Sequence, residues 1–185
     1  MAGMETTPDM FDLRMSEAAR PLYERVLDFI ATEIEPKTDE FFRLGSERDE
    51  RWSYGPGQLE LLDSIKDRAK QAGLWNFFLP DAETGEGLSN LDYAYIAMEL
   101  GRNPIASECL NCSAPDTGNM EVLERVGTPE QKEQWLKPLL AGEIRSAYAM
   151  TEPDIPSSDA KNISCRAVKD GDEWVITGEK YWTSG

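Results

Sequence analysis

The chain has 185 residues and a formal net charge of −16, which argues against nucleic acid and anionic membrane surfaces as partners because both would repel it. Its 40% hydrophobic and 29% charged residues are ordinary for a globular protein of one domain or two small ones. The sequence contains no histidine, which excludes Ser-His and Cys-His nucleophilic sites and histidine-ligated metals.

The first part of the chain is predicted to be helical after a flexible arm at residues 1–15. Ser16 can cap a helix, because its hydroxyl can accept a bond from an unpaired N–H of the first turn. Pro36 predicts a kink or break in this helix, after which Phe41 and Phe42 continue the helical pattern. One face of the first helix is apolar and carries Ala18, Leu22, Val26, Phe29 and Ile30.

Two further helices are expected after a surface loop over 45–57. The range 58–71 repeats apolar residues at helical spacing, and 75–80 reads as an apolar connection that packs on the helices rather than as a ligand cage. Ser89 can cap a helix over 90–100, whose inward positions are predicted to be Leu91, Ala94, Tyr95, Met98 and Leu100.

The last helices lie between residues 105 and 140. A short apolar helix is predicted over 105–112 and a longer one over 116–126. Thr128 followed by Pro129 is typical of a capped first turn, and this helix is expected to end before Gly142.

Near Ser146 the period of the apolar residues changes from helical to strand-like. The range 147–151 reads as a strand that ends at Glu152-Pro153, and 163–168 reads as a second strand. An Asp-Gly turn within 169–172 then leads to a returning strand at 173–177. Helices followed by strands predict an α+β fold, with an all-α N-terminal helical domain over 16–145 and an incomplete β domain beginning at 146.

The three cysteines do not indicate a site. Cys109 and Cys112 have the spacing of a redox motif, but no second pair completes a zinc site and no βαβ pattern surrounds them. We interpret them, with Cys165, as ordinary thiols in a reducing compartment. The N-terminus has neither a signal-peptide nor a transit-peptide pattern, and no apolar run is long enough to span a bilayer, so we expect a cytoplasmic protein.

The strand region carries a combination of motifs that is more specific than any one of them. It contains Thr151-Glu152-Pro153, Ser157-Ser158-Asp159, the hairpin, and Gly-x-Lys-x-Trp-Thr-Ser over 178–184. With the upstream ranges 127–132 and 136–142, this pattern resembles the acyl-CoA dehydrogenase family of FAD enzymes. The loop after Pro153 is one residue longer than the common family form. Together with residues 111–123, it is similar to the branch whose larger members carry an added phosphotransferase-like domain.

The resemblance implies a set of FAD contacts. Tyr148 and Met150 would present backbone groups to the flavin ring, and Thr151 would offer its backbone N–H and hydroxyl as donors. Trp182 would lie against one face of the ring, and Ser184, with Thr183 beside it, would reach N5. For the phosphate contact we expect Ser158 first and Ser157 second, because the longer loop shifts the family serine. Glu152 is interpreted as structural.

The resemblance also implies what the chain does. The family has an N-terminal helical domain, a middle β domain and a C-terminal helical bundle, and this chain matches the first and the opening strands of the second. The family's catalytic glutamate lies in the bundle, so we assign no catalytic and no metal-binding residue. We expect the N-terminal part of a FAD-dependent acyl-CoA dehydrogenase, inactive as this chain alone. The implied partners are an acyl-CoA substrate, an electron-transfer flavoprotein or similar acceptor, and further copies of the full-length protein. The alternative is a non-catalytic helical interaction module that keeps the family fold.

Overall fold

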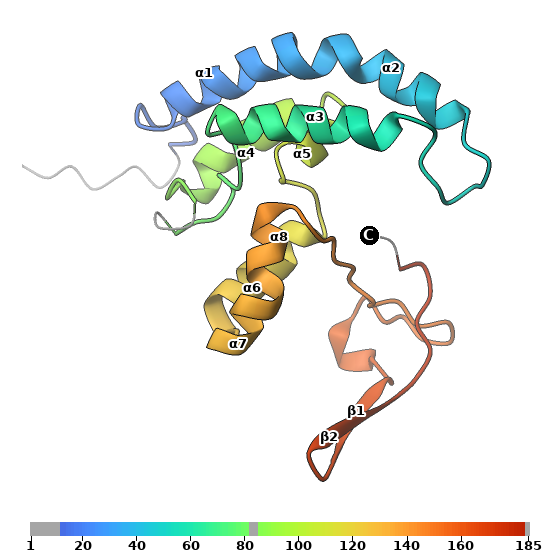
Figure 1. Cartoon of the computed structure of the whole chain (residues 1–185). Coiled ribbons are helices and arrows are strands. Elements are labelled where there is room, and N and C mark those ends of the chain that lie inside the picture. The colour runs from blue at the N-terminus through green and yellow to red at the C-terminus, as the bar shows by residue number, and fades with distance from the viewer. Residues whose placement is uncertain (1–11, 82–84, 184–185) are drawn as a thin grey trace, which may run out of the picture. The chain divides into compact units, whose positions relative to one another are not determined.

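The computed structural model describes residues 12–81 and 85–183, and the chain divides into two compact units, Met1–Ser113 and Ala114–Gly185 (Figure 1). The regular elements of the described chain are helical as far as Ala141, and a two-stranded sheet follows. This order confirms the α+β fold class. The division at Ala114 lies upstream of the change from helix to strand at Ser146. The predicted domain bounds therefore stay a prediction.

The first unit consists of helices, with α1 and α2 forming one long bowed helix beside α3 (Figure 1). Its elements are α1 (Arg20–Phe29), the π-helical turn η1 (Ile30–Ile34), α2 (Glu35–Ser46), α3 (Gln58–Gln71), α4 (Asn90–Leu100) and α5 (Ala106–Cys109).

Pro36 does not end the first helix. It is the second residue of α2, and the η1 turn immediately before it is widened, with the N–H of Glu35 donating to the carbonyl of Ile30. Proline has no N–H, and its ring crowds the carbonyl four residues earlier, so a widened turn lets the helix pass through it. The same arrangement recurs at Pro138, the second residue of the helix that follows another π-helical segment, Lys132–Leu136.

Ser16 caps a turn rather than the start of α1. Its hydroxyl accepts a 3.2 Å bond from the N–H of Ala19, and α1 begins at Arg20. The backbone N–H of Ser16 donates to the buried carboxylate of Asp92 at 2.7 Å. Because the regular helix begins later than predicted, Ala18 is exposed and Ala19 is buried in its place.

The predicted inward face of α4 was wrong except at Leu100, which is buried. Ile96, which was not predicted, is also buried, whereas Ala94 and Met98 are exposed. The helix is apolar on most sides, so its sequence period could not select a face. Asp92 selects it, because its carboxylate is buried by bonds from Ser16 and Ser89, and residues four apart share one helix face.

A single hydrophobic core lies within the first unit. Phe77, Phe78 and Leu79 are buried, which confirms that the apolar connection packs on the helices. Trp75 lies at its edge beneath the ammonium group of Lys70, 4.7 Å from the ring centre. The helices contribute these fully buried side chains: Val26, Ile34, Leu62, Ile65, Ile96 and Leu100.

The second unit combines short helices with a hairpin. Its elements are α6 (Asp116–Val126), α7 (Pro129–Gln131), the π-helical η2 (Lys132–Leu136), α8 (Lys137–Ala141), the 3-10 turn η3 (Ala160–Asn162), β1 (Arg166–Asp170) and β2 (Glu173–Thr177). Thr128 caps α7 as predicted: its hydroxyl accepts from the N–H of Gln131, whose side chain accepts in return from the Thr128 N–H.

The predicted hairpin is confirmed, but the predicted first strand is not. Strands β1 and β2 pair antiparallel, with Ala167 opposite Ile176, and Gly171 turns the chain with a φ of 60°. Residues 147–151 belong to no ladder; one isolated bridge follows them, between Glu152 and Ile155. Apolar alternation marks an extended segment, but a strand also needs a neighbouring backbone to pair with.

The core of the first unit gives a stability prediction. Ile65→Ala removes a fully buried side chain of α3, and we expect it to lower the free energy of unfolding by about 2–5 kcal/mol. Leu59→Ala on the same helix is the matched control, because Leu59 is 42% exposed. Urea titrations of both variants would measure the difference. Equal stability losses would contradict the assignment of this helix face.

Candidate functional site

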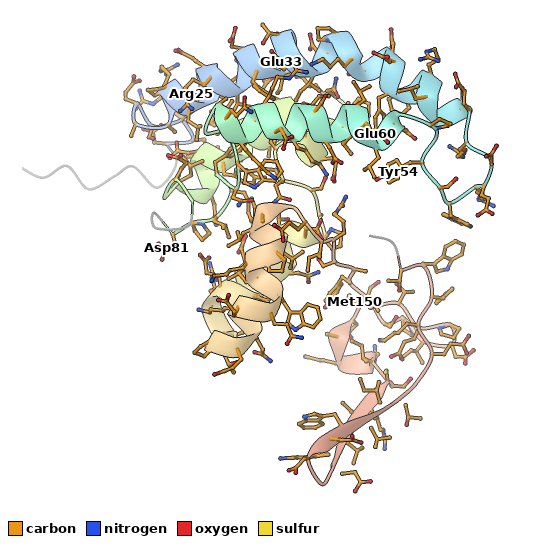
Figure 2. The ribbon with its side chains drawn as sticks, viewed as in Figure 1. Arg25, Glu33, Tyr54, Glu60, Asp81 and Met150 are labelled. Carbon is orange, nitrogen blue, oxygen red and sulfur yellow. The ribbon has the colours of Figure 1, made fainter. Side chains whose placement is uncertain are left out.

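The motif residues converge in the second unit on the segment around Met150, which Figure 2 labels. The backbone N–H of Tyr181 donates to the carbonyl of Thr151 at 3.1 Å. One residue earlier, the ammonium group of Lys180 donates to the carbonyl of Met150 at 2.9 Å. Two consecutive carbonyls are thus held by two consecutive residues that lie thirty positions later in the chain.

Glu152 connects three parts of this region. Its carboxylate is buried, with 3% of the residue exposed, and it accepts from the N–H and hydroxyl of Ser164 at 2.8 and 2.6 Å. It also accepts from the N–H of Cys165 at 2.9 Å and from the ammonium group of Lys180 at 2.8 Å. The bond from Lys180, followed by those from Ser164, lowers the pKa of Glu152 from 4.5 to about 2. These contacts agree with the structural interpretation of Glu152.

The two candidate serines for the phosphate contact lie in different surroundings. Ser157 is 1% exposed, and its hydroxyl accepts from the N–H of Glu152 at 2.7 Å. Its neighbour Ser158 is exposed at the loop surface. Ser158 remains the predicted phosphate contact, because the hydroxyl of Ser157 is already engaged inside the loop.

Thr151 has donors that the described chain does not use. Its carbonyl accepts from Tyr181, but its N–H and hydroxyl have no hydrogen-bond partner among residues 12–81 and 85–183. Thr151 is only partly exposed, so these donors lie at the edge of the folded segment. Unpaired donors in such a position can bind an oxygen or nitrogen acceptor of a ligand.

Trp182 directly follows Tyr181, the residue whose N–H donates to the Thr151 carbonyl. Its indole is 82% exposed, its φ is 58°, and its ring centre lies 5.7 Å from that of Tyr181. A left-handed backbone is unfavourable for a bulky residue, and such conformations cluster at ligand sites. Tyr148 and Thr183 are also exposed, and Ser184 lies outside the described residues.

One pair of positioning residues was missed in the sequence. Asp116, the first residue of α6, is buried and accepts from the N–H and hydroxyl of Ser146 at 2.7 and 2.6 Å and from the guanidinium of Arg145. The amide of Asn119 donates to the same hydroxyl at 2.8 Å. Both fix the point where the chain enters the Met150 segment. The spacing of Asp116 and Asn119, one turn apart at a helix start, was the signal available.

The remaining features of the described residues do not add a second candidate site. Burial raises the pKa of the Cys109 and Cys112 thiols to about 12, which keeps them protonated at neutral pH. In the part of the chain that the structure describes, no group of three or more potential ligands could hold a metal ion. No described helix is long and apolar enough to cross a membrane.

Comparison with known proteins identifies the family. Residues 16–143 match the acyl-CoA dehydrogenase N-terminal domain, and the chain belongs to the acyl-CoA dehydrogenase family. It is 47% identical over 176 residues to acyl-CoA dehydrogenase family member 10 of Mus musculus, covering 92% of this chain and 16% of that protein.

Solved structures agree with this family. One named as a putative acyl-CoA dehydrogenase from Mycobacterium abscessus superposes with a TM-score of 0.81 at 48% identity, covering 93% of this chain and 43% of its own. A glutaryl-CoA dehydrogenase from Mycobacterium smegmatis in complex with FADH2 shares the fold, with a TM-score of 0.63 at 24% identity over 95% of this chain and 41% of its own. The chain therefore spans less than half the length of these relatives.

The Glu152 contacts predict how stability depends on pH. Because the folded pKa is about 2 and the ordinary value is 4.5, the unfolded chain takes up this proton first as pH falls. The stabilisation is complete above about pH 4.5 and is lost towards pH 2. Glu152→Gln should remove this slope while lowering stability at neutral pH, because Lys180 loses its charged partner.

Urea unfolding followed by the amide NMR signals of Ser164 and Cys165 would measure this effect. Glu179→Gln is the control, because this substitution removes the same charge from an exposed residue next to Lys180. A Glu152→Gln variant that keeps the acid slope of the parent chain would contradict the assignment.

Proposed function

We propose that this chain is the N-terminal, FAD-contacting part of an acyl-CoA dehydrogenase that forms the α,β double bond of an acyl-CoA thioester. The observation that carries the proposal is the bond from the Tyr181 N–H to the Thr151 carbonyl. It joins Thr151, whose N–H and hydroxyl have no partner among the described residues, to the residue directly before the exposed Trp182, although the two segments are distant in the sequence.

These residues fit a flavin. A flat ring needs donors at its edge and an apolar surface against its face, and the second unit offers both in one segment pair. The N–H and hydroxyl of Thr151 would bind the pyrimidine edge, and Trp182 would cover one face and exclude water. Tyr148 and Met150 would contribute backbone groups, with Thr183 and Ser184 near N5. When bound, FAD supplies the acceptor for the hydride that leaves the β carbon.

The net charge of −16 shapes how the cofactor and the thioester are bound. Both ligands are polyanions, so the protein as a whole repels them and their affinity must come from local donors. Ser158 is exposed in the loop after Pro153 and is our candidate for a phosphate contact.

The proton α to the thioester has no assigned acceptor in this chain. We therefore expect the isolated chain not to oxidise acyl-CoA: anaerobic mixing with FAD and acyl-CoAs of varied length should leave the flavin absorbance unbleached. Bleaching at a catalytic rate would contradict our inference that the catalytic base lies outside these residues.

A full-length protein would pass electrons to an electron-transfer flavoprotein or similar acceptor and would assemble from several copies.

The reading frame beyond Gly185 separates this proposal from a helical interaction module. A frame that continues into a helical segment with a glutamate supports the dehydrogenase, whereas a stop codon directly after Gly185 supports the module. The cytoplasmic location stays a prediction from the sequence.

Two substitutions test the flavin contacts. They are made in the protein encoded by the reading frame that continues beyond Gly185, called here the extended frame. Thr151→Ala removes a donor to the reduced ring, and we expect it to lower both FAD affinity and flavin potential, at a cost of about 1–3 kcal/mol in binding. Trp182→Ala removes apolar contact and should weaken FAD retention by a similar amount and admit oxygen to the ring.

Matched controls are available in the hairpin. Trp174→Ala removes an indole that is 64% exposed in β2, and Thr177→Ala removes an exposed hydroxyl at the end of the same strand. Bound-FAD stoichiometry and redox titration would compare the four variants. If the Thr151 and Trp182 variants behave like the controls, neither residue contacts the ring.

A further inference from the structure

Lys180 is a partly buried cation that the flavin contacts described above do not use. Its side chain is 21% exposed, and its ammonium group lies 2.9 Å from the Met150 carbonyl and 2.8 Å from a carboxylate oxygen of Glu152. The side chain of Glu152 is 3% exposed, so the two charges neutralise each other away from bulk water. Lys180 therefore acts through the geometry of its bonds more than through its charge.

The bond to Met150 fixes a peptide plane. The peptide between Met150 and Thr151 is trans, since the cis bond of the described chain is Ala114-Pro115. In a trans peptide the C=O and the N–H point in opposite directions. Because the Met150 carbonyl points to Lys180, the Thr151 N–H points away from it.

The next peptide is held in the same way. The Thr151 carbonyl accepts from the Tyr181 N–H, and Glu152 receives its own bonds from Ser164 and Cys165. Residues on both sides of the Thr151 N–H are thus anchored. The donor itself has no partner within the described residues, so the contacts around it orient a group that is left for a ligand.

We propose that Lys180, held by Glu152, is a positioning residue that turns the Met150–Thr151 peptide so that the Thr151 N–H faces the flavin ring. This role rests on the proposed flavin site. If the peptide rotated, a carbonyl oxygen would replace the N–H at the ring edge, where the reduced flavin carries negative charge. Lys180 acts on the ring through this peptide and does not touch it.

The first test needs no cofactor and uses the 185-residue chain. The carbonyl 13C signal of Met150 reports whether its oxygen accepts a hydrogen bond. Lys180→Met should shift this signal, Lys180→Arg should restore most of the parent value, and Lys169→Met on the exposed strand β1 should leave it unchanged. A Met150 signal that is the same in Lys180→Met and in the parent chain would overturn the proposal.

The second test uses the extended frame with FAD. Losing one oriented donor should weaken FAD binding about tenfold in Lys180→Met and lower the flavin potential, with recovery in Lys180→Arg. The Tyr181–Thr151 hydrogen-bond coupling, measured on the 185-residue chain, checks that the segment stays folded. If Lys180→Met loses this coupling, the proposal is tested with Lys180→Arg instead. A Lys180→Arg variant that recovers neither the Met150 signal nor FAD affinity would overturn the proposal.

The outcomes separate this inference from the proposed function. If the parent protein binds FAD and Lys180→Met binds it equally well at an unchanged potential, the positioning role is wrong while the flavin site stands. If the parent protein in the extended frame binds no FAD, both are wrong.

Discussion

The fold of the second unit depends on one constraint: the buried carboxylate of Glu152 must be hydrogen-bonded. An ionised Glu152 removed from water costs free energy unless its oxygens receive donors. Ser164, Cys165 and Lys180 supply those donors from two later segments of the chain. The carboxylate of Glu152 therefore joins the Thr-Glu-Pro motif to the Gly-x-Lys-x-Trp motif, beside the bonds from Tyr181 and Lys180 to the carbonyls of Thr151 and Met150.

Buried carboxylates connect distant segments elsewhere in this acidic chain. Asp92 at the start of α4 accepts from the N–H of Ser16, and Asp116 at the start of α6 accepts from Ser146. In both cases a first-turn acid receives a backbone N–H from a segment far away in sequence. A helix N-terminus favours negative charge, so a carboxylate is well suited to serve as a fixed acceptor at these positions. Their positions determine where Ser16 and the segment before Met150 are attached.

The proposed flavin site would have to bind a polyanion in a chain of large negative charge. The charge that opposes binding is spread over the surface, whereas the proposed donors are single oriented groups such as the Thr151 N–H. Lys180, which donates to the carbonyl of the preceding residue Met150, is neutralised by Glu152. Under this proposal, recognition would depend on hydrogen-bond direction and on the apolar face of Trp182 more than on net attraction.

The sequence by itself determined the local elements and the family. Ser89 and Thr128 cap their helices as predicted, and the Asp-Gly turn forms the hairpin, because each of these bonds joins residues at most four positions apart. The motif combination over 151–184 identified the acyl-CoA dehydrogenase family, and the comparisons confirmed it.

Only the tertiary structure decided which long-range partners satisfy the buried polar groups. In the folded chain Asp92 lies on the buried face of α4, and residues 147–151 have no strand partner. Ser157 is buried, and Lys180 bonds the carbonyl of Met150. None of these follows from a local period. Ser157 bonds the N–H of Glu152 five positions earlier, and the others depend on groups many residues away. A sequence pattern records which residues can form such bonds, and folding selects the partners by leaving the fewest buried donors and acceptors unpaired.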